Sequence, residues 1–385
     1  MKIALVLYQY SDSRGGVERY VSDLSKGLLA NGHEVHIFAH QVDEVPQGLS
    51  KNRLIFHPVP VFLRGYTPFR LISFAQNSSK MLTKERFDII QGFGRTYYQD
   101  VYRFGSGCHW EYLKQTHSSM KYIYGRMLQK LNPRNKIILH LEKKAFRKGH
   151  YKKIVCISKR VKQEVQDYYN VPEDDLDVIY NGIDTERFNP RNKNKFRESI
   201  RQSLKIKTYE IVILFVGSGF LRKGLRYAIE SLVFLPKELP IRLLVMGKGN
   251  IKAYQKLATK WRVNDKLIYG GTSSNIEQYY AASDIFLLPT LYEAFGTAYL
   301  EAMATGLPAL VSQRAGAAEV ITNMVDAFVL DDPTNASEIA QKLSLLQDET
   351  LRTNMGRAAY FTALKYPFQK NLARTLQIYA NIHDV

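Results

Sequence analysis

The amino-acid sequence predicts an α/β protein with two doubly wound domains, each built around a parallel sheet. Short, nearly continuous apolar segments alternate with segments whose apolar residues recur at helical spacing. This pattern is typical of buried parallel strands and the helices that cover them. The length of 385 residues also fits two domains. One polar segment, 188–207, interrupts the alternation, and we interpret it as the connection between the domains.

Each half of the chain shows the alternation. In the first half we expect strands at 2–8, 34–39, 87–91 and 153–158, and helices at 15–30 and 158–169. In the second half we expect strands at 211–216, 241–246, 267–269, 284–288 and 309–312, and helices at 223–234, 253–261, 276–282 and 295–305. Ser158 has the residue type and the place of a helix N-cap. Because ligands bind at the carboxyl ends of doubly wound sheets, two such domains are expected to share a cleft there.

The composition excludes several classes of protein. Two cysteines, Cys108 and Cys156, are too few for a disulfide framework or a four-cysteine zinc site, and they fit a reducing compartment. No window approaches 18 consecutive apolar residues, so no transmembrane helix is expected. The apolar start of the chain covers only about seven residues before a glycine loop, and we interpret it as a first strand rather than a signal peptide.

Most of the positive charge lies in one stretch. The formal net charge is +18, and residues 113–163 contain 15 Lys and Arg against one acid, Glu142. Aromatic and aliphatic residues lie between these charges at helix-like spacing, as in a cationic amphipathic helix on an anionic membrane surface. A solvated helix, or a surface that binds nucleic-acid phosphates, gives the same pattern. The charge alone therefore does not select the partner.

Two glycine-containing loops follow predicted strands. Gly15 and Gly16 open the first helix, where free N–H groups can meet an anion, although such a pair is more often only a turn. The loop 217–224 (GSGFLRKG) places Arg222 and Lys223 at a helix start. Because the helix dipole disfavours cations there, we favour a bound diphosphate over an exposed pair. The glycine patterns of dinucleotide-binding dehydrogenases and P-loop NTPases do not occur at these loops.

The segment EAFGTAYLE contains two carboxylates eight residues apart. Glu293 precedes a predicted helix, and Glu301 lies two turns along it. Carboxylates are strong acceptors for sugar and ribose hydroxyl groups, and backbone N–H groups around Gly296 suit a phosphate. Helix capping by Glu293 is the alternative. Asp175 and Asp177 have the spacing of a metal-binding D-x-D, but we interpret them as part of a solvated turn and predict no metal.

These motifs, taken in order, resemble the family-four retaining glycosyltransferases, which have the GT-B fold. The resemblance rests on the E-x7-E segment with Leu-Pro before it and Ala-Met-Ala-Thr-Gly-Leu-Pro after it, on the Gly-Gly loop, on Asn-Gly-Ile-Asp at 181–184, on Arg-Lys-Gly and on Gly247. It extends over essentially the whole chain and is strongest toward lipopolysaccharide core glucosyltransferases. It implies an acceptor-binding domain, 1–187 with a returning helix in 366–385, and a nucleotide-sugar-binding domain, 188–365.

The resemblance also implies roles for individual residues. Glu293 holds the donor sugar, Arg222 and Lys223 neutralise the diphosphate leaving group, and Glu301 binds the nucleotide ribose. His109 lies beside the donor sugar in many relatives, and a structural histidine in a polar loop is the alternative. Further contacts to the donor are implied for Gly15, Gly16, Arg187, Gly217, Gly247, Phe295, Gly296 and Thr297.

The activity that the resemblance implies is transfer of a hexose, with retention of the anomeric configuration, from a nucleotide diphosphate sugar to a glycan or lipid-linked acceptor such as lipopolysaccharide core. UDP-glucose is the expected donor, and no other cofactor is expected. Mannosyl transfer from GDP-mannose, DNA glucosylation and non-catalytic binding of a nucleotide sugar are the alternatives. The basic stretch 113–163 then suggests a cytoplasmic, peripheral protein on the inner face of the membrane, with nucleic acid an unexpected partner.

Overall fold

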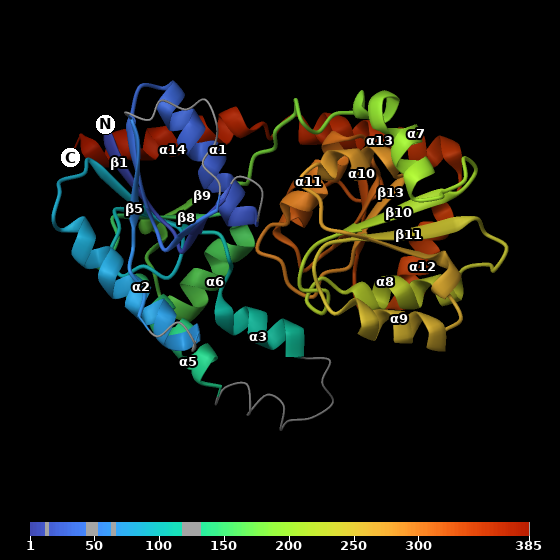
Figure 1. Ribbon diagram of the computed structural model, residues 1–385, viewed down its shortest axis with the longest axis horizontal. Coiled ribbons are helices and arrows are strands. Elements are labelled where there is room, and N and C mark those ends of the chain that lie inside the picture. The colour runs from blue at the N-terminus through green and yellow to red at the C-terminus, as the bar shows by residue number, and fades with distance from the viewer. Residues whose placement is uncertain (12–14, 44–52, 63–66, 118–131, 385) are drawn as a thin grey trace. The chain divides into compact units, whose positions relative to one another are not determined.

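The protein forms two compact units (Figure 1). The computed structural model describes residues 1–11, 15–43, 53–62, 67–117 and 132–384. Unit 1 contains Met1–Tyr180 and Gln369–Val385, and unit 2 contains Asn181–Phe368. The boundaries thus lie at 180/181 and 368/369, whereas the sequence suggests 187/188 and 365/366.

Unit 1 is built on a seven-stranded sheet in the order β5-β3-β1-β6-β7-β8-β9, in which all neighbours are parallel. Its strands are β1 (Lys2–Val6), β3 (Glu34–Ala39), β5 (Leu54–Pro58), β6 (Ile89–Gly92), β7 (Val101–Phe104), β8 (Lys153–Cys156) and β9 (Leu176–Val178). Ile3 of β1 lies opposite Val35 of β3 on one side and Ile89 of β6 on the other. A separate parallel pair joins β2 (Gln9–Tyr10) to β4 (Gln41–Val42).

Helices accompany this sheet, and one of them comes from the end of the chain. They are α1 (Gly16–Ala30), α2 (Thr67–Leu82), α3 (His109–His117), α5 (Pro133–Ala145), α6 (Lys159–Tyr169) and α14 (Phe368–His383). Ser158 is the N-cap of α6, as predicted, because its Oγ accepts a hydrogen bond from the Val161 N–H at 3.1 Å. The Tyr379 hydroxyl of α14 donates to the side chain of Gln91 in β6. No helix in the described ranges is both long and apolar enough to cross a membrane.

Unit 2 repeats the design with a six-stranded parallel sheet in the order β12-β11-β10-β13-β14-β15. Its strands are β10 (Ile211–Val216), β11 (Ile241–Met246), β12 (Leu267–Gly271), β13 (Ile285–Leu288), β14 (Ala309–Ser312) and β15 (Ala327–Leu330). Its helices are α7 (Asn192–Ser203), α8 (Leu225–Ser231), α9 (Ile251–Lys260), α10 (Ile276–Ala282), α11 (Thr297–Ala304), α12 (Ala336–Leu345) and α13 (Glu349–Ala363).

In both sheets the order in which the chain adds strands reverses at a central strand. In unit 1 the chain adds β3 and β5 on one side of β1, then continues with β6 on the other side; β10 and β13 have the same relation in unit 2. The two Rossmann-like parallel sheets confirm the predicted α/β fold class. Ligands of such sheets bind beyond the carboxyl ends of the two strands at the reversal. The loops after β1, β6, β10 and β13 are therefore the places to look for a site.

The segment 188–207 is not a plain connection, because it contains α7. The polar sequence of this helix has a structural partner in Asp284, which lies just before β13. The guanidinium groups of Arg197 and Arg201 each donate to one oxygen of the Asp284 carboxylate. The Arg201 side chain is 6% exposed, so this ion pair ties α7 into the core of unit 2.

Asp175 and Asp177 do not lie in a solvated turn. Asp175 ends a short 3-10 turn that leads directly into β9, and Asp177 is the middle residue of that strand. Asp175 accepts from Lys148 Nζ at 2.7 Å, and Asp177 pairs with Lys153 Nζ at 3.4 Å. The two carboxylates therefore form ion pairs with these lysines at the edge strand β9 and just before it.

Candidate active site

The loop that follows β10 is fixed against the end of β13. Gly224 has φ 76°, and a Cβ atom there would lie 1.9 Å from the carbonyl oxygen of Pro289, so this position requires glycine. The carbonyl oxygen of Arg222 accepts from the Leu291 N–H at 2.8 Å and from Thr290 Oγ at 3.1 Å. The two loops at the reversal of the unit 2 sheet therefore form one connected structure.

Glu293 is held by the two neighbouring cations of that loop. Arg222 Nη1 donates to Glu293 Oε2 at 2.6 Å and to the carbonyl oxygen of Tyr292 at 3.0 Å. Lys223 Nζ donates to the same Oε2. The side chains of Lys223 and Glu293 are largely enclosed, whereas that of Arg222 is 30% exposed. These three side chains together carry a net charge of +1, which suits an anionic ligand, although Glu301 also attracts Lys223 from a distance.

The charges of this cluster fix the protonation of Glu293. Burial alone would raise its pKa, but Lys223 and then Arg222 outweigh burial and lower the pKa to about 2. Burial lowers the pKa of Lys223, against the opposing attraction of Glu293. Because Glu293 stays ionised near neutral pH, it can act as an acceptor and a counter-ion, but it is a poor general acid.

Glu301 and the start of α11 lie on the same segment as Glu293. Glu301 Oε2 accepts from the Tyr280 hydroxyl at 2.8 Å. Helix α11 begins at Thr297, directly after Gly296, whose φ is 98°. Thr297 Oγ accepts from Asn181 Nδ2 at 3.0 Å, so the Asn-Gly-Ile-Asp motif supports the first turn of α11.

Other predicted donor contacts of unit 2 have structural partners of their own. Arg187 Nε donates to Glu277 Oε2 at 2.8 Å, and its Nη2 donates to the carbonyl oxygen of Ser274. Contact with a donor phosphate would require this ion pair to open. A Cβ atom on Gly247 would lie 2.2 Å from the carbonyl oxygen of Gly217. This close backbone approach accounts for the glycine at 247 without a ligand.

In unit 1 the side chain of Glu18 reaches the N-terminus of α1. Gly15 has φ 70°, and a Cβ atom there would lie 1.9 Å from Glu18 Oε2. Burial raises the pKa of Glu18, while hydrogen bonds from the backbone N–H groups of Glu18 and Val17 lower it. Because this carboxylate already binds N–H groups of the first turn, a donor phosphate at Gly15 and Gly16 would have to displace it.

His109 lies in a pocket of about 560 Å³ within unit 1, which we call the unit 1 pocket. The pocket lies beyond the ends of β1, β6 and β7. The His109 N–H donates to Glu142 Oε2 at 3.1 Å, and its ring Nε2 lies 3.0 Å from Asn135 Oδ1. The sequence analysis missed four charged residues that also line this pocket: Glu18, Arg95, Arg134 and Glu142.

Burial makes Glu142 an unusual carboxylate. Burial raises its pKa to about 7, although hydrogen bonds from the Tyr169 hydroxyl at 2.6 Å and from the His109 N–H act in the opposite direction. In the sequence, Glu142 is the only acid among the 15 Lys and Arg of residues 113–163. A single acid in such a basic stretch was the sequence signal that could have indicated a buried role for Glu142.

The basic stretch is only partly described. Residues 118–131, which include Lys121, Arg126 and Lys130, lie outside the described residues. In the described part, Ile138 and Leu141 of α5 are buried in a core cluster with Leu71 of α2. Ile138 and Leu141 therefore belong to the interior of unit 1. The apolar residues at 122–131, on which the predicted amphipathic helix mainly depends, lie outside the described residues.

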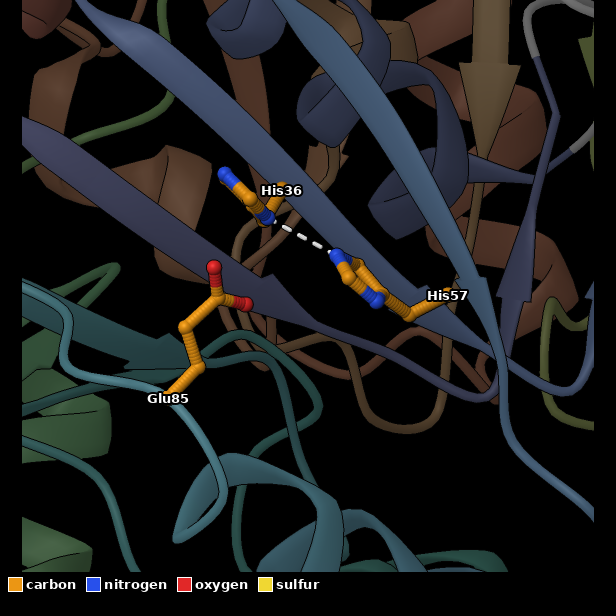
Figure 2. A group of neighbouring side chains, drawn as sticks. All are labelled: His36, His57 and Glu85. Carbon is orange, nitrogen blue, oxygen red and sulfur yellow. Dashed lines mark hydrogen bonds between the residues drawn. The ribbon is translucent and has the colours of Figure 1, made fainter.

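One group in the described ranges has the residue types of a metal site (Figure 2). His36 Nδ1 lies 2.8 Å from His57 Nε2, and Glu85 lies within 4.8 Å of both rings. Two nitrogen ligands of a tetrahedral zinc ion would lie about 3.3 Å apart. Glu34 accepts from His36 at 2.6 Å and Lys2 pairs with Glu85, so hydrogen bonds account for the group. Metal independence remains a prediction.

The fold and the cluster around Glu293 together define a class of protein: two Rossmann-like units, the second of which presents paired cations at the reversal of its sheet. Family models agree with this class. Residues 14–187 match Glycosyltransferase Family 4, and residues 196–361 match Glycosyl transferases group 1. The chain belongs to the family-four type of glycosyltransferase with the GT-B fold.

Individual relatives support the same assignment. The lipopolysaccharide glucosyltransferase WaaG of Escherichia coli is 26% identical over 346 residues, 89% of this chain and 88% of the relative. An uncharacterised glycosyltransferase of Methanocaldococcus jannaschii is 27% identical over 347 residues, 88% of this chain and 87% of the relative. The crystal structure of WaaG matches 98% of this chain and 99% of its own with a TM-score of 0.85 and 24% identity. Anabaena HepE in complex with UDP-glucose matches 98% of this chain and 99% of its own with a TM-score of 0.73 and 17% identity.

Proposed function

We propose that the protein transfers glucose from UDP-glucose to a glycan or lipid-linked acceptor, such as a lipopolysaccharide core, without a metal and with retention of configuration. The observation that carries the proposal is the joint contact of Arg222 and Lys223 with Glu293 at the reversal of the unit 2 sheet. The name of the relative WaaG supports a glucosyl donor and a lipopolysaccharide acceptor. The HepE complex with UDP-glucose supports the choice of nucleotide.

The cluster suits departure of a diphosphate. In the proposed step, the bond between the anomeric carbon and the UDP oxygen breaks, and the acceptor oxygen attacks the anomeric carbon from the same face. The acceptor proton passes to the departing phosphate, so the products are UDP and the glucoside. Negative charge develops on the phosphate oxygens, where Arg222 and Lys223 stabilise it. Glu293 is ionised and holds both cations in place.

A panel of donors tests the proposal. The full chain is incubated separately with UDP-glucose, UDP-galactose, UDP-N-acetylglucosamine and GDP-mannose, and released nucleotide and sugar are measured. We expect slow hydrolysis of UDP-glucose in the presence of a metal chelator, with α-glucose as the first product by NMR. A preference for GDP-mannose would show that the proposed donor, UDP-glucose, is wrong. Binding without release of sugar would indicate a non-catalytic protein. Transfer of sugar to DNA but to no glycan or lipid-linked acceptor would show that the proposed acceptor class is wrong.

We further infer that the basic stretch brings the enzyme to the cytoplasmic face of an anionic membrane. Replacing Lys121, Arg126 and Lys130 together by Gln should reduce co-sedimentation with vesicles that contain anionic lipid, because each lost charge near the surface weakens binding. Donor hydrolysis in solution should be unchanged. The control replaces the exposed Lys237, Lys252 and Lys256 of unit 2 by Gln, which removes the same charge elsewhere. Equal sedimentation of both triple variants would contradict membrane docking by this stretch.

A further inference from the structure

Two arginines line the unit 1 pocket without a hydrogen-bonding partner. Arg95 lies in the loop after β6, and Arg134 lies in the first turn of α5. Within the described part of the chain, neither guanidinium forms a hydrogen bond or an ion pair. Arginines elsewhere in the molecule, such as Arg160 and Arg197, contact carboxylates directly. The pocket thus holds two cations whose hydrogen-bond donors are unused.

The charges around Arg95 act on its guanidinium in both directions. Burial lowers the pKa of Arg95, and the nearby charge of Arg134 lowers it further, while Glu142 opposes both. The side chains of Arg95 and Arg134 line the pocket and are both exposed to solvent. A partly desolvated cation is stabilised when an anion compensates the positive charge and accepts hydrogen bonds from the cation. An anion that enters the pocket would do both.

The backbone also points to a functional position. Arg95 has φ 59°, a left-handed conformation that is uncommon for a residue with a side chain, and it follows Gly94 with φ 106°. Such strained residues cluster at ligand sites. The loop begins where β6 ends, at the reversal of the unit 1 sheet, which is where doubly wound sheets bind ligands.

The acids of the pocket attract Arg95 at a distance but form no direct ion pair with it in the described part of the chain. Glu142 has a pKa of about 7, so it is only partly ionised near neutral pH, and its oxygen accepts from His109 and Tyr169. Glu18 is held by backbone N–H groups of α1, and the charge of Arg95 also lowers its pKa. Both acids lie in the pocket wall. An entering anion would meet two available guanidinium groups and two carboxylates with other partners.

We infer that the unit 1 pocket binds an anionic group of the acceptor, a phosphate or a carboxylate, through Arg95 and Arg134. The inference rests on the proposed function because it names the acceptor. It makes Arg95 and Arg134 specificity-determining residues, since an acceptor without the anion would leave both guanidinium groups unpaired. The same chemistry would also suit the diphosphate of the donor, so the experiment separates these two sources.

Sulfate binding tests the inference. The full chain is titrated with sodium sulfate at constant ionic strength, and binding is followed by fluorescence of Trp110, which is next to His109 in α3, and by the shift in unfolding temperature. Trp261 is replaced by Phe in every sample to remove the signal of unit 2. We expect Arg95→Gln and Arg134→Gln each to weaken sulfate binding about tenfold, because each removes a charge-assisted contact. Glu142→Gln should tighten it severalfold by removing a nearby negative charge.

Controls distinguish the possible outcomes. Arg86→Gln removes an exposed arginine outside the pocket and should bind sulfate like the parent. Arg95→Lys keeps the charge and should restore part of the affinity, which guards against a folding defect in Arg95→Gln. The inference would be overturned if Arg95→Gln and Arg134→Gln bound sulfate as well as the parent does. It would also be overturned if UDP competed with sulfate and this competition required Arg95 and Arg134. Donor hydrolysis by the parent is measured in parallel: its absence beside intact sulfate binding would count against the proposed function alone.

Discussion

Glu293→Gln should abolish most donor turnover and destabilise unit 2. The change removes the carboxylate that Arg222 and Lys223 share. It leaves Lys223 enclosed without its counter-ion, and breaking a buried pair in this way costs about 3–5 kcal/mol of unfolding free energy. Turnover of UDP-glucose should fall at least about a hundredfold, since the two cations lose the group that positions them. Urea denaturation and released UDP measure the two effects.

A matched control separates the role of Glu293 from general charge effects. Glu238→Gln removes an exposed carboxylate from the same unit and should change neither stability nor turnover appreciably. Turnover is compared at a temperature at which both variants remain folded by circular dichroism. Retention of parental turnover by folded Glu293→Gln would remove this residue from the site.

Arg222→Met and Lys223→Met should each reduce kcat for the donor about a hundredfold to a thousandfold. Their charges are needed most when the diphosphate departs, so kcat should fall more than KM rises. Both side chains donate to the same oxygen of Glu293. The losses of the double variant should therefore be smaller than the product of the single losses, because the residues act as a unit.

Steady-state kinetics with UDP-glucose tests this expectation, and Lys237→Gln, which removes an exposed lysine of unit 2, is the control. A rise in KM with unchanged kcat would mean that the two cations bind donor and transition state equally. In that case another group would have to stabilise the leaving diphosphate. Strict additivity of the two variants would show that Arg222 and Lys223 act separately.

The fold could be predicted because its central strands are short apolar segments between helices of clear periodicity. Strands β1, β3, β10 and β11 belong to this class. The missed strands are short or carry polar residues, such as the half-buried His57 in β5 and the buried Arg103 in β7. Helix α7 was missed because its partner, Asp284, lies more than 80 residues away along the chain. Ion pairs of this range leave no local pattern.

The two halves of the site differ in how far the sequence predicts them. In unit 2, Arg222 and Glu293 each lie in a distinctive loop after a strand, and the reversal of the sheet brings those loops together. In unit 1, the loop at Arg95 and the helix at Arg134 carry no motif, and only the packing of α5 makes them neighbours of Glu142. Motifs that fold locally were predictable, whereas a pocket assembled from distant segments was not.

The place of α14 in unit 1 has a consequence for synthesis. Unit 2 is one continuous stretch, Asn181–Phe368, whereas unit 1 lacks α14 until this later segment has been made. During translation unit 2 can complete its sheet first, while β6 still waits for the Tyr379 contact from the final helix. Unit 1 is thus completed after unit 2, and a chain that stops soon after Phe368 contains all of unit 2 but lacks the helix that completes unit 1.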